Sequence, residues 1–247
     1  NNTLPLKAVR RIAVIGPMAQ NRLHLLGSWS AHGREEDAVS VFAGLENEYR
    51  NRAELLYARG CDFDGEDRSG FREAVAAASE ADVVVLCLGE KKNWSGENAS
   101  RSTIALPEIQ EQLAAELAKT GKPVVLVLSS GRPLELRRLE PLCGAMVQMW
   151  QTGIRGGNPL AGILSGRINP SGKLAMTFPY STGQIPIYYN RRQSGRTHQG
   201  KYQDIPSTPL YEFGHGLSYT TFEYGDPKSS ATTLRRGEKA TVTVTVT

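Results

Sequence analysis

Two carboxylates, one tryptophan and several cations lie within a single short polar segment of the sequence, residues 89–103. Glu90 and Glu97 are the carboxylates, and Trp94 lies between them. The cations are Lys91, Lys92 and Arg101. A carboxyl group beside an aromatic ring can have its pKa raised by desolvation and can then act as a general acid, while an exposed indole can stack on a sugar face. A solvated loop with an ordinary salt bridge is the alternative, and residue chemistry alone leaves both interpretations open.

This segment follows one of five short apolar runs that helical patterns separate. The runs, which predict buried strands, are 11–16, 55–57, 81–88, 124–128 and 144–150. Helices are predicted at 38–50, 69–79, 107–119, 134–140 and 159–164. This alternation predicts an α/β fold with a mostly parallel sheet flanked by helices, a three-layer α/β/α sandwich. Ligands of such sheets bind at the loops after the carboxyl ends of strands, which is where the polar segment lies.

The pattern changes after about residue 165. Residues 166–216 are rich in Gly, Pro, Tyr and Arg with little periodicity, whereas 240–247 alternate strictly and predict a half-buried antiparallel strand. About 30 residues follow Leu217, too few for the roughly 100 of a β-sandwich. We therefore expect an α/β domain over 1–216 and the beginning of a second domain over 217–247, in a fragment of a longer polypeptide.

The positive charge of the chain is concentrated in one stretch. Its 29 Lys and Arg against 25 Asp and Glu give a net charge of +4, yet no acid lies between Glu140 and Asp204. That stretch holds seven cations: Arg155, Arg167, Lys173, Arg191, Arg192, Arg196 and Lys201. They are scattered among Gly, Pro and Asn, unlike the dense basic patches of nucleic-acid-binding proteins. Nucleic-acid binding is therefore not expected. Membrane insertion is not expected either, because the sequence has no apolar run of about 18 residues.

Cysteine and histidine spacing gives no sign of a metal site. The three cysteines form no C-x-x-C pair, and the four histidines show no clustered spacing. After the first apolar run, Met18 and Asn21 stand where a dinucleotide-binding loop needs glycine. We expect neither a metal nor an organic cofactor. Trp29 and Trp150 are interpreted as core or interface packing.

Several motifs, in their order and spacing, resemble glycoside hydrolase family 3 β-glucosidases, especially the periplasmic enzymes of bacteria. The similarity runs from about Arg11 to Tyr224. Its landmarks are Ile12-Ala-Val-Ile-Gly-Pro17, Leu25-Leu-Gly-Ser-Trp-Ser30, Val83-Val-Val-Leu-Cys-Leu-Gly-Glu90, Ser95-Gly-Glu-Asn-Ala-Ser-Arg101, Val124-Val-Leu-Val-Leu-Ser-Ser-Gly-Arg-Pro133, Asn169-Pro-Ser-Gly-Lys-Leu174, Gln184-Ile-Pro-Ile-Tyr-Tyr189 and Leu210-Tyr-Glu-Phe-Gly-His-Gly-Leu-Ser-Tyr-Thr220. The chain is similar to the second, α/β sandwich domain of these enzymes.

The resemblance implies an active site divided between domains. In this family an N-terminal (β/α)8 barrel, absent from this chain, carries the aspartate nucleophile and most sugar-binding residues, and a fibronectin-III-like domain commonly follows the sandwich. The sandwich lends the acid/base glutamate on the loop after its third strand. This implies Glu97 as the acid/base and Glu90 as the second choice, with Glu90 expected to orient the loop through backbone N–H groups. Asn98-Ala-Ser departs from the Tyr-Asp that some relatives carry before Arg101.

The resemblance also implies partners and a location. A β-glucoside or oligosaccharide is the expected substrate, contacted by Trp94, Arg101 and Arg196, and the barrel is the expected partner domain. The protein is expected to be periplasmic or secreted, and the chain alone is expected to show negligible hydrolysis. The alternative function is a non-catalytic α/β module for carbohydrate binding or interdomain contact.

Overall fold

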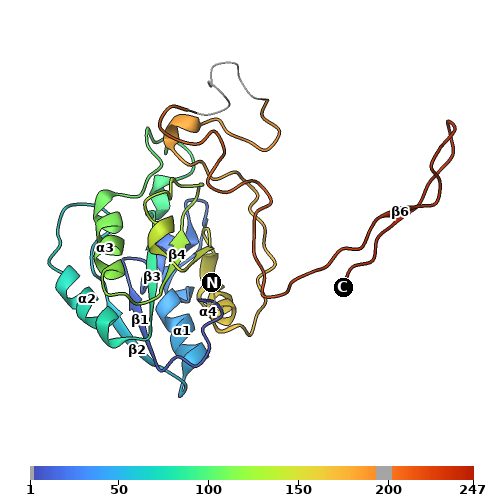
Figure 1. The fold of residues 1–247 in the computed structure, drawn as a ribbon. Coiled ribbons are helices and arrows are strands. Elements are labelled where there is room, and N and C mark those ends of the chain that lie inside the picture. The colour runs from blue at the N-terminus through green and yellow to red at the C-terminus, as the bar shows by residue number, and fades with distance from the viewer. Residues whose placement is uncertain (1–2, 193–201) are drawn as a thin grey trace.

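Five apolar segments form one parallel sheet in the order β2-β1-β3-β4-β5 (Figure 1). The computed structural model describes residues 3–192 and 202–247. The strands are β1 (Arg11–Ile15), β2 (Glu54–Ala58), β3 (Val83–Gly89), β4 (Val124–Ser129) and β5 (Ala145–Gln148). All four strand pairs are parallel, which confirms the predicted sheet.

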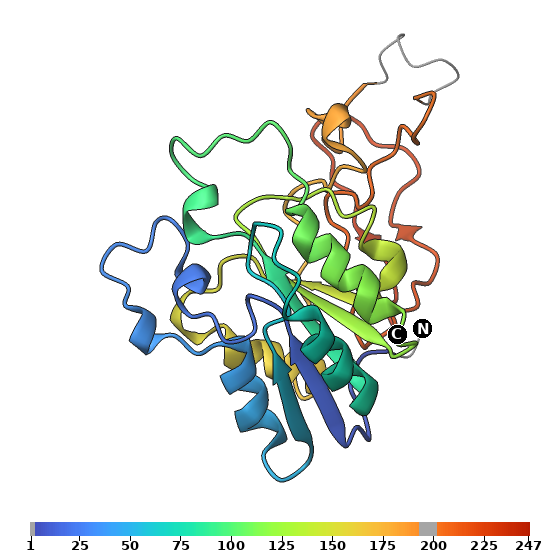
Figure 2. The same ribbon diagram turned by 90° about the vertical axis from the view of Figure 1, so that its left-hand side faces the viewer.

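Four α-helices cover the two faces of this sheet. They are α1 (Val41–Tyr49), α2 (Phe71–Glu80), α3 (Glu108–Ala118) and α4 (Gly157–Ser165). Helices α1 and α4 pack on one face, and α2 and α3 on the other, as Figures 1 and 2 show. The structure is therefore the predicted sandwich of helices, sheet and helices. Four of the five helical predictions match these elements to within a few residues.

The residues of β3 alternate between the two cores. Val83, Val85 and Cys87 join the cluster beneath α1 and α4, and their neighbours along the strand join the cluster beneath α2 and α3. Every residue of β3 is buried, because a strand covered on both faces has no side facing solvent. This explains why the strand appears in the sequence as a continuous apolar run.

The order of the strands places the loop after β3 at the centre of one sheet edge. The chain moves from β1 to β2 in one direction and returns to β3 on the other side of β1, which is the switch point where α/β sheets bind ligands. Two glycines let the backbones meet there. A Cβ at Gly16 would lie 2.2 Å from the Cys87 carbonyl oxygen, and one at Gly89 would lie 2.1 Å from that of Ser129.

The helix predicted at 134–140 is wrong. Glu135 forms a parallel bridge with Ala105, and the nearest helical element is a short 3-10 turn, Glu140–Leu142. Leu134 and Leu136, two residues apart, are both buried in the core beneath α2 and α3. That spacing matches the period of two of an extended chain, so burial of both leucines favours extended backbone.

The irregular segment 166–216 folds back onto the domain. Residues 174–178 exchange backbone hydrogen bonds with 210–215, and Phe178 is buried in the core beneath α2 and α3. Two cations of the acid-free stretch make intramolecular contacts. Arg167 forms an ion pair with Glu48 of α1 at 2.8 Å, and Lys173 donates a hydrogen bond to the Gly216 carbonyl.

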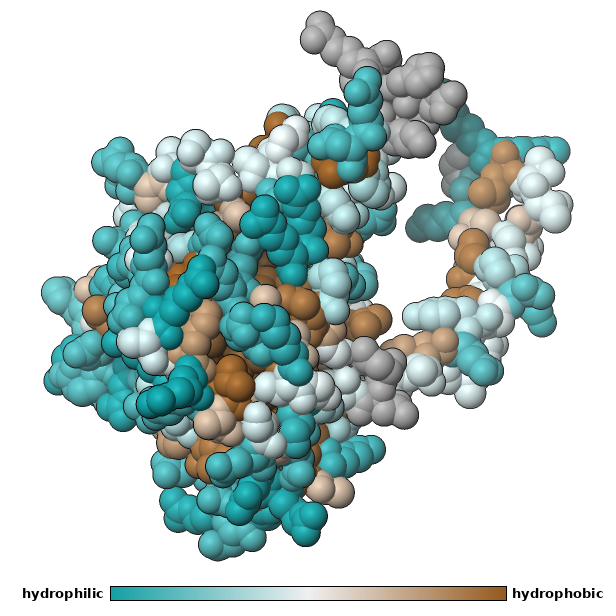
Figure 3. All heavy atoms as spheres, turned by 60° about the vertical axis from the view of Figure 1, so that its left-hand side comes forward, coloured by the Kyte–Doolittle hydropathy of each residue, from teal (hydrophilic) through white to brown (hydrophobic). Residues whose placement is uncertain are grey.

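The C-terminal residues form an arm that stands clear of the sheet (Figures 1 and 3). Two short antiparallel strands, β6 (Lys228–Ser229) and β7 (Val242–Thr243), pair within it. The antiparallel pairing agrees with the prediction, but β7 covers only two residues of the predicted strand 240–247. The predicted half-burial is wrong, since Val242 is 66% exposed. A two-stranded arm has no second layer against which its apolar face can pack.

Two further observations concern the described ranges only. Within residues 3–192 and 202–247, no helix is long and apolar enough to cross a lipid bilayer. The same ranges contain no group of three or more His, Cys, Asp or Glu side chains arranged to hold a metal ion.

Candidate active site

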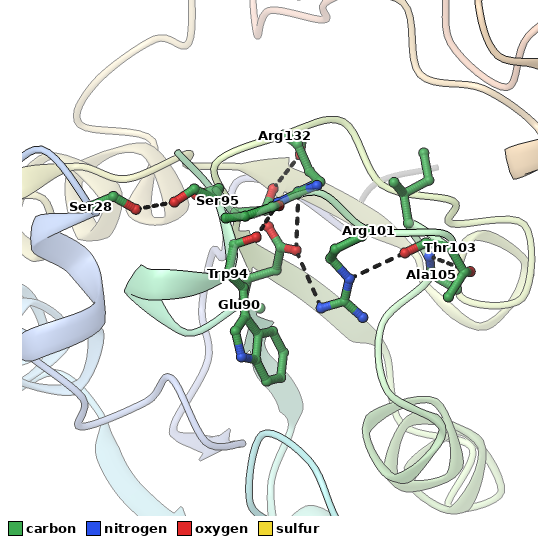
Figure 4. Close-up of polar contacts among 12 residues, drawn as sticks. Ser28, Glu90, Trp94, Ser95, Arg101, Thr103, Ala105 and Arg132 are labelled. Carbon is green, nitrogen blue, oxygen red and sulfur yellow. Dashed lines mark hydrogen bonds and ion pairs between the residues drawn. The ribbon is translucent and has the colours of Figure 1, made fainter. Parts of the chain in front are cut away.

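Three loops from the carboxyl edge of the sheet meet around the segment that follows β3. The loop after β1 contributes Ser28, the loop after β4 contributes Gly131 and Arg132, and the loop after β5 contributes Gln151. Each of them contacts residues 92–99, as Figure 4 shows in part. The polar segment singled out in the sequence is therefore supported by loops distant from it in the chain.

Glu90 is the buried carboxylate of this cluster. Its side chain is 2% exposed and points toward two guanidinium groups, with Oε1 3.4 Å from Nε of Arg132 and 3.8 Å from Nη1 of Arg101 (Figure 4). Burial raises the pKa of Glu90, while Arg132, Arg101 and the N–H of Gly131 partly lower it. Glu90 is thus enclosed between cations. Its contacts are with two guanidinium groups and with the N–H of Gly131, and the expected role of orienting the loop through backbone N–H groups stays a prediction.

Arg132 links the loop after β4 to the loop after β3. Its Nη2 donates to the carbonyl oxygens of Trp94 and Ala99, the second at 2.9 Å. The two carbonyls lie on either side of Glu97 in the sequence. Sequence reasoning missed this residue as part of the site. Its position in the sequence could have indicated the role, because Arg132 follows the predicted strand 124–128 and therefore lies at the same carboxyl edge of the sheet as the polar segment.

Serine and glutamine side chains hold the first half of the same segment. The hydroxyl of Ser28 lies within hydrogen-bond reach of the carbonyl oxygens of Lys92 and Ser95. Gln151 donates from Nε2 to Oγ of Ser95 at 3.1 Å. Packing is tight here, because a Cβ at Gly131 would lie 1.9 Å from that oxygen. The loop is therefore fixed at its base by both hydrogen bonds and close contact.

Glu97 lies at the exposed tip of this supported loop. Neighbouring residues have left-handed backbone, with φ of +103° at Gly96 and +58° at Asn98, conformations that glycine and asparagine adopt at least cost. Within the described ranges, the Glu97 side chain has no hydrogen bond or ion pair, and it is exposed. The turn thus presents one carboxylate to solvent while its base is rigid.

Trp94 and Arg101 contact each other within the same loop. The Arg101 guanidinium lies 5.0 Å from the centre of the Trp94 ring and the Lys91 ammonium 5.3 Å from it. The indole is half-buried and packs against the core beneath α1 and α4. Arg101 also donates from Nε to the Thr103 carbonyl at 3.2 Å. Both residues therefore make internal contacts that stabilise the loop.

The arrangement can supply an accessible carboxyl group for proton transfer. It presents an accessible carboxylate at the tip of a supported loop and, directly after β3, a second carboxylate that is enclosed and paired with two cations. Residues 1–219 match the glycosyl hydrolase family 3 C-terminal domain. The chain belongs to glycoside hydrolase family 3.

The chain is similar in sequence to named glycosidases and in structure to a solved β-glucosidase. The chain is 40% identical to a "Periplasmic beta-glucosidase" of Salmonella typhimurium, covering 99% of this chain and 36% of that protein. It is 39% identical to a "Beta-xylosidase" of Formosa agariphila, covering 100% and 35%. A β-glucosidase of Listeria innocua, solved with isofagomine, matches with a TM-score of 0.86 at 40% identity, covering 98% and 34%. The chain thus spans about a third of the length of these family 3 relatives.

Three further aromatic or basic residues were singled out in the sequence. Trp29 is 72% exposed, and its Nε1 lies 3.3 Å from the position of a Cβ on Gly96. The core alternative for Trp29 is therefore wrong, because the loop after β1 leaves the ring exposed next to Gly96. The interface alternative stays a prediction. Trp150, by contrast, packs against the core beneath α2 and α3. Arg196, expected to contact substrate, lies outside the described residues.

Proposed function

We propose that this chain is the acid/base-supplying domain of a retaining β-glucosidase. In this proposal Glu97 protonates the departing glycosidic oxygen and later deprotonates water. The nucleophilic aspartate lies on a (β/α)8 barrel of the same polypeptide. The observation that carries the proposal is the contrast between the two carboxylates: Glu97 is exposed at the tip of a supported loop, whereas Glu90 is 2% exposed between two guanidinium groups.

The chemistry of retention explains why one accessible carboxylate is sufficient on this domain. Retaining glycosidases use two carboxyl groups about 5–5.5 Å apart, one on each side of the scissile bond. A group that alternates between acid and base must reach both the leaving oxygen and a water molecule. Exposure of Glu97 is compatible with that access, and the ion pairs of Glu90 are not. We therefore assign half of the catalytic pair to this chain and none of the turnover to the chain alone.

The names of the relatives support the substrate class. Two of the similar proteins are called β-glucosidases and one a β-xylosidase, so terminal β-linked sugars are the proposed substrates. A terminal β-D-glucosyl residue is the first choice. The name of the Salmonella relative supports a periplasmic location. Residues 217–247, with their antiparallel arm, are proposed as the beginning of a fibronectin-III-like domain.

The test compares substrates with good and poor leaving groups in the complete enzyme. We expect Glu97→Gln to lower kcat/KM for phenyl β-D-glucoside by about 10² to 10⁴-fold, the usual contribution of general acid catalysis. For 2,4-dinitrophenyl β-D-glucoside, whose leaving group needs no proton, the loss should stay below about 10-fold. The alkaline limb of the pH profile of kcat/KM should disappear together with the acid.

Two controls make the assignment specific. With Glu97→Ala, which leaves space for an anion, added azide should raise kcat for the dinitrophenyl substrate and yield β-glucosyl azide. Glu90→Gln should retain the alkaline limb, because its acid/base group is intact. Loss of that limb in Glu90→Gln and its survival in Glu97→Gln would reverse the assignment. Robust hydrolysis by the 247-residue chain alone would refute the division of the site between domains.

A further inference from the structure

The part of the loop that follows Glu97 has a single outside support. Ser28 and Gln151 bind Lys92 and Ser95, all before the proposed acid/base. Residues 97–100 receive only one hydrogen bond from a side chain outside the loop within the described ranges, namely that of Arg132 to the Ala99 carbonyl at 2.9 Å. The local backbone contact from Ala99 N–H to the Gly96 carbonyl is long, at 3.4 Å.

Arg132 joins the two ends of the turn through one nitrogen. The same Nη2 that binds Ala99 also donates to the Trp94 carbonyl, so the guanidinium bridges the residues on either side of Glu97 (Figure 4). A planar guanidinium carries five N–H groups in a fixed fork and can serve several acceptors at once. A lysine ammonium at this position would be a point charge without that fork.

Glu90 in turn restricts the orientation of this guanidinium. Its buried carboxylate lies at the end of β3 and faces the Nε edge of Arg132 at 3.4 Å, while Nη2 faces the loop carbonyls. The side chain of Arg132 is only 19% exposed, so few alternative rotamers reach water. The carboxylate that was the second choice for the acid/base therefore pairs with the arginine that binds the loop of the first choice.

We propose that Arg132 is a positioning residue for the reaction, holding the turn of Glu97 across the carbonyls of Trp94 and Ala99, with Glu90 as its anchor. The inference rests on the proposed function of Glu97. The positioning itself is a property of the loop that can be measured without turnover. Arg132 touches neither substrate nor the reacting atoms in this scheme.

Loss of Arg132 should affect one step of the reaction selectively. Released residues 97–100 would let the carboxyl of Glu97 move from the leaving oxygen, and misplacement of a catalytic group by about 1 Å can cost about 10²-fold in rate. Binding of the sugar ring by the barrel should change little, so the loss should appear in kcat rather than in KM. Substrates that need protonation should lose most.

The experiment compares three variants of the complete enzyme. Arg132→Ala removes the bridge, and Arg132→Lys keeps a cation opposite Glu90, which protects folding. Arg138→Ala is the matched control, since Arg138 is exposed and pairs with Glu111 away from the loop. We expect kcat for phenyl β-D-glucoside to fall about 10²-fold in Arg132→Ala and less in Arg132→Lys. The dinitrophenyl substrate should change by less than about 10-fold, and Arg138→Ala should match the parent.

Three readouts separate positioning from catalysis. The alkaline limb of the pH profile should survive in both Arg132 variants, because the carboxyl group of Glu97 is still present, whereas Glu97→Gln abolishes it. Added guanidinium chloride at non-denaturing concentration should partly restore Arg132→Ala and should not restore Glu97→Gln. Deuterium uptake by the peptide containing 95–101 should rise in both Arg132 variants and stay at the parent level in Arg138→Ala.

The outcomes decide between the two proposals. Equal losses on both substrates, or unchanged kinetics with unchanged deuterium uptake, would overturn the role of Arg132. If Glu97→Gln keeps its alkaline limb while the Arg132 variants still loosen the loop, the assignment of Glu97 fails and the bridge stands as a structural feature only. If Arg132→Ala does not fold, the Arg132→Lys variant supplies the same comparison.

Discussion

Replacing Gly131 with alanine should displace the proposed acid/base loop by steric contact alone. The Cβ of an alanine there would lie 1.9 Å from Oγ and 2.6 Å from Cβ of Ser95. Ser95 is buried, and its Oγ accepts a hydrogen bond from Gln151. The backbone of Gly131 does not have positive φ, so the expected penalty comes from this contact and not from the conformation of the alanine.

The distances set the size of the effect. Ordinary contact begins near 3.4 Å, so the Ser95 hydroxyl must move by about 1.5 Å and its Cβ by about 0.8 Å. Rotation of the side chain can relieve the first clash only, and the second requires the backbone of the loop to shift. Overpacking of this kind typically costs 1–3 kcal/mol of unfolding free energy. With Glu97 two residues away, a shift near 1 Å predicts a loss of about 10²-fold in kcat for phenyl β-D-glucoside.

The assay combines urea unfolding of the 247-residue chain with kinetics of the complete enzyme. Gly172→Ala is the control, because a Cβ at Gly172 meets nothing within 4 Å, and it should be neutral or stabilising by up to about 1 kcal/mol. Adding Ser95→Gly removes both clashing atoms. A double-mutant cycle should therefore show that Gly131→Ala costs at least about 1 kcal/mol less in the Ser95→Gly background.

Two results would refute this reasoning. One is a Gly131→Ala variant as stable and as active as Gly172→Ala, which would mean that the loop accommodates the methyl group without moving. The other is strict additivity of Gly131→Ala and Ser95→Gly, which would place the cost somewhere other than their contact.

Two further predictions concern the stability of the domain. Burial raises the pKa of Glu90 from its ordinary 4.5, so the folded chain binds more protons than the unfolded chain just above that pH, and this group's contribution to unfolding free energy falls as pH rises through the window. The unfolding free energy of the parent relative to Glu90→Gln, measured in urea from pH 4 upward, should therefore decline with pH; a rising difference would contradict the desolvation argument. Where α1 and α4 cross, a Cβ on Gly44 would lie 2.1 Å from the Gly157 carbonyl oxygen. Because a backbone atom cannot rotate away as a side chain can, Gly44→Ala should lower the free energy of unfolding in urea by about 3 kcal/mol. A decrease of less than about 1 kcal/mol would contradict this packing argument.

The strands and helices of the sandwich were predictable because the apolar pattern of each segment indicates which of its faces are buried. The run Val83–Gly89 is apolar throughout, since helices cover both faces of the strand. The amphipathic spacing of 69–79 similarly marks a helix with one buried face, observed as α2. The prediction for 134–140 was wrong because the leucine spacing is ambiguous. Leu136 and Leu139 are three residues apart, as in a helix, whereas Leu134 and Leu136 are two apart, as in an extended chain. The bridge between Glu135 and Ala105 favours the extended chain.

The chemistry of the site was predictable in part. A polar loop directly after a buried strand marks a binding edge in any α/β sheet, and the motif around Glu97 resembles that of one family. The exposure of Trp29 was not predictable, because an apolar ring in a Gly- and Ser-rich loop gives no local indication of its burial. The roles of the two carboxylates were also open until their surroundings were known.

By itself, the sequence determined the alternation of strands and helices, the loop that carries the carboxylates, and the family that its motifs resemble. These properties are local, because hydrophobic periodicity and strand-end position are set by residues adjacent in the chain. Only the tertiary structure decided that Glu90 is enclosed, that Glu97 is exposed, and that Arg132 bridges the backbone carbonyls on either side of Glu97. Those facts depend on the strand order that places β3 beside β4, a long-range pairing through which residues 33 and 38 positions apart come into contact.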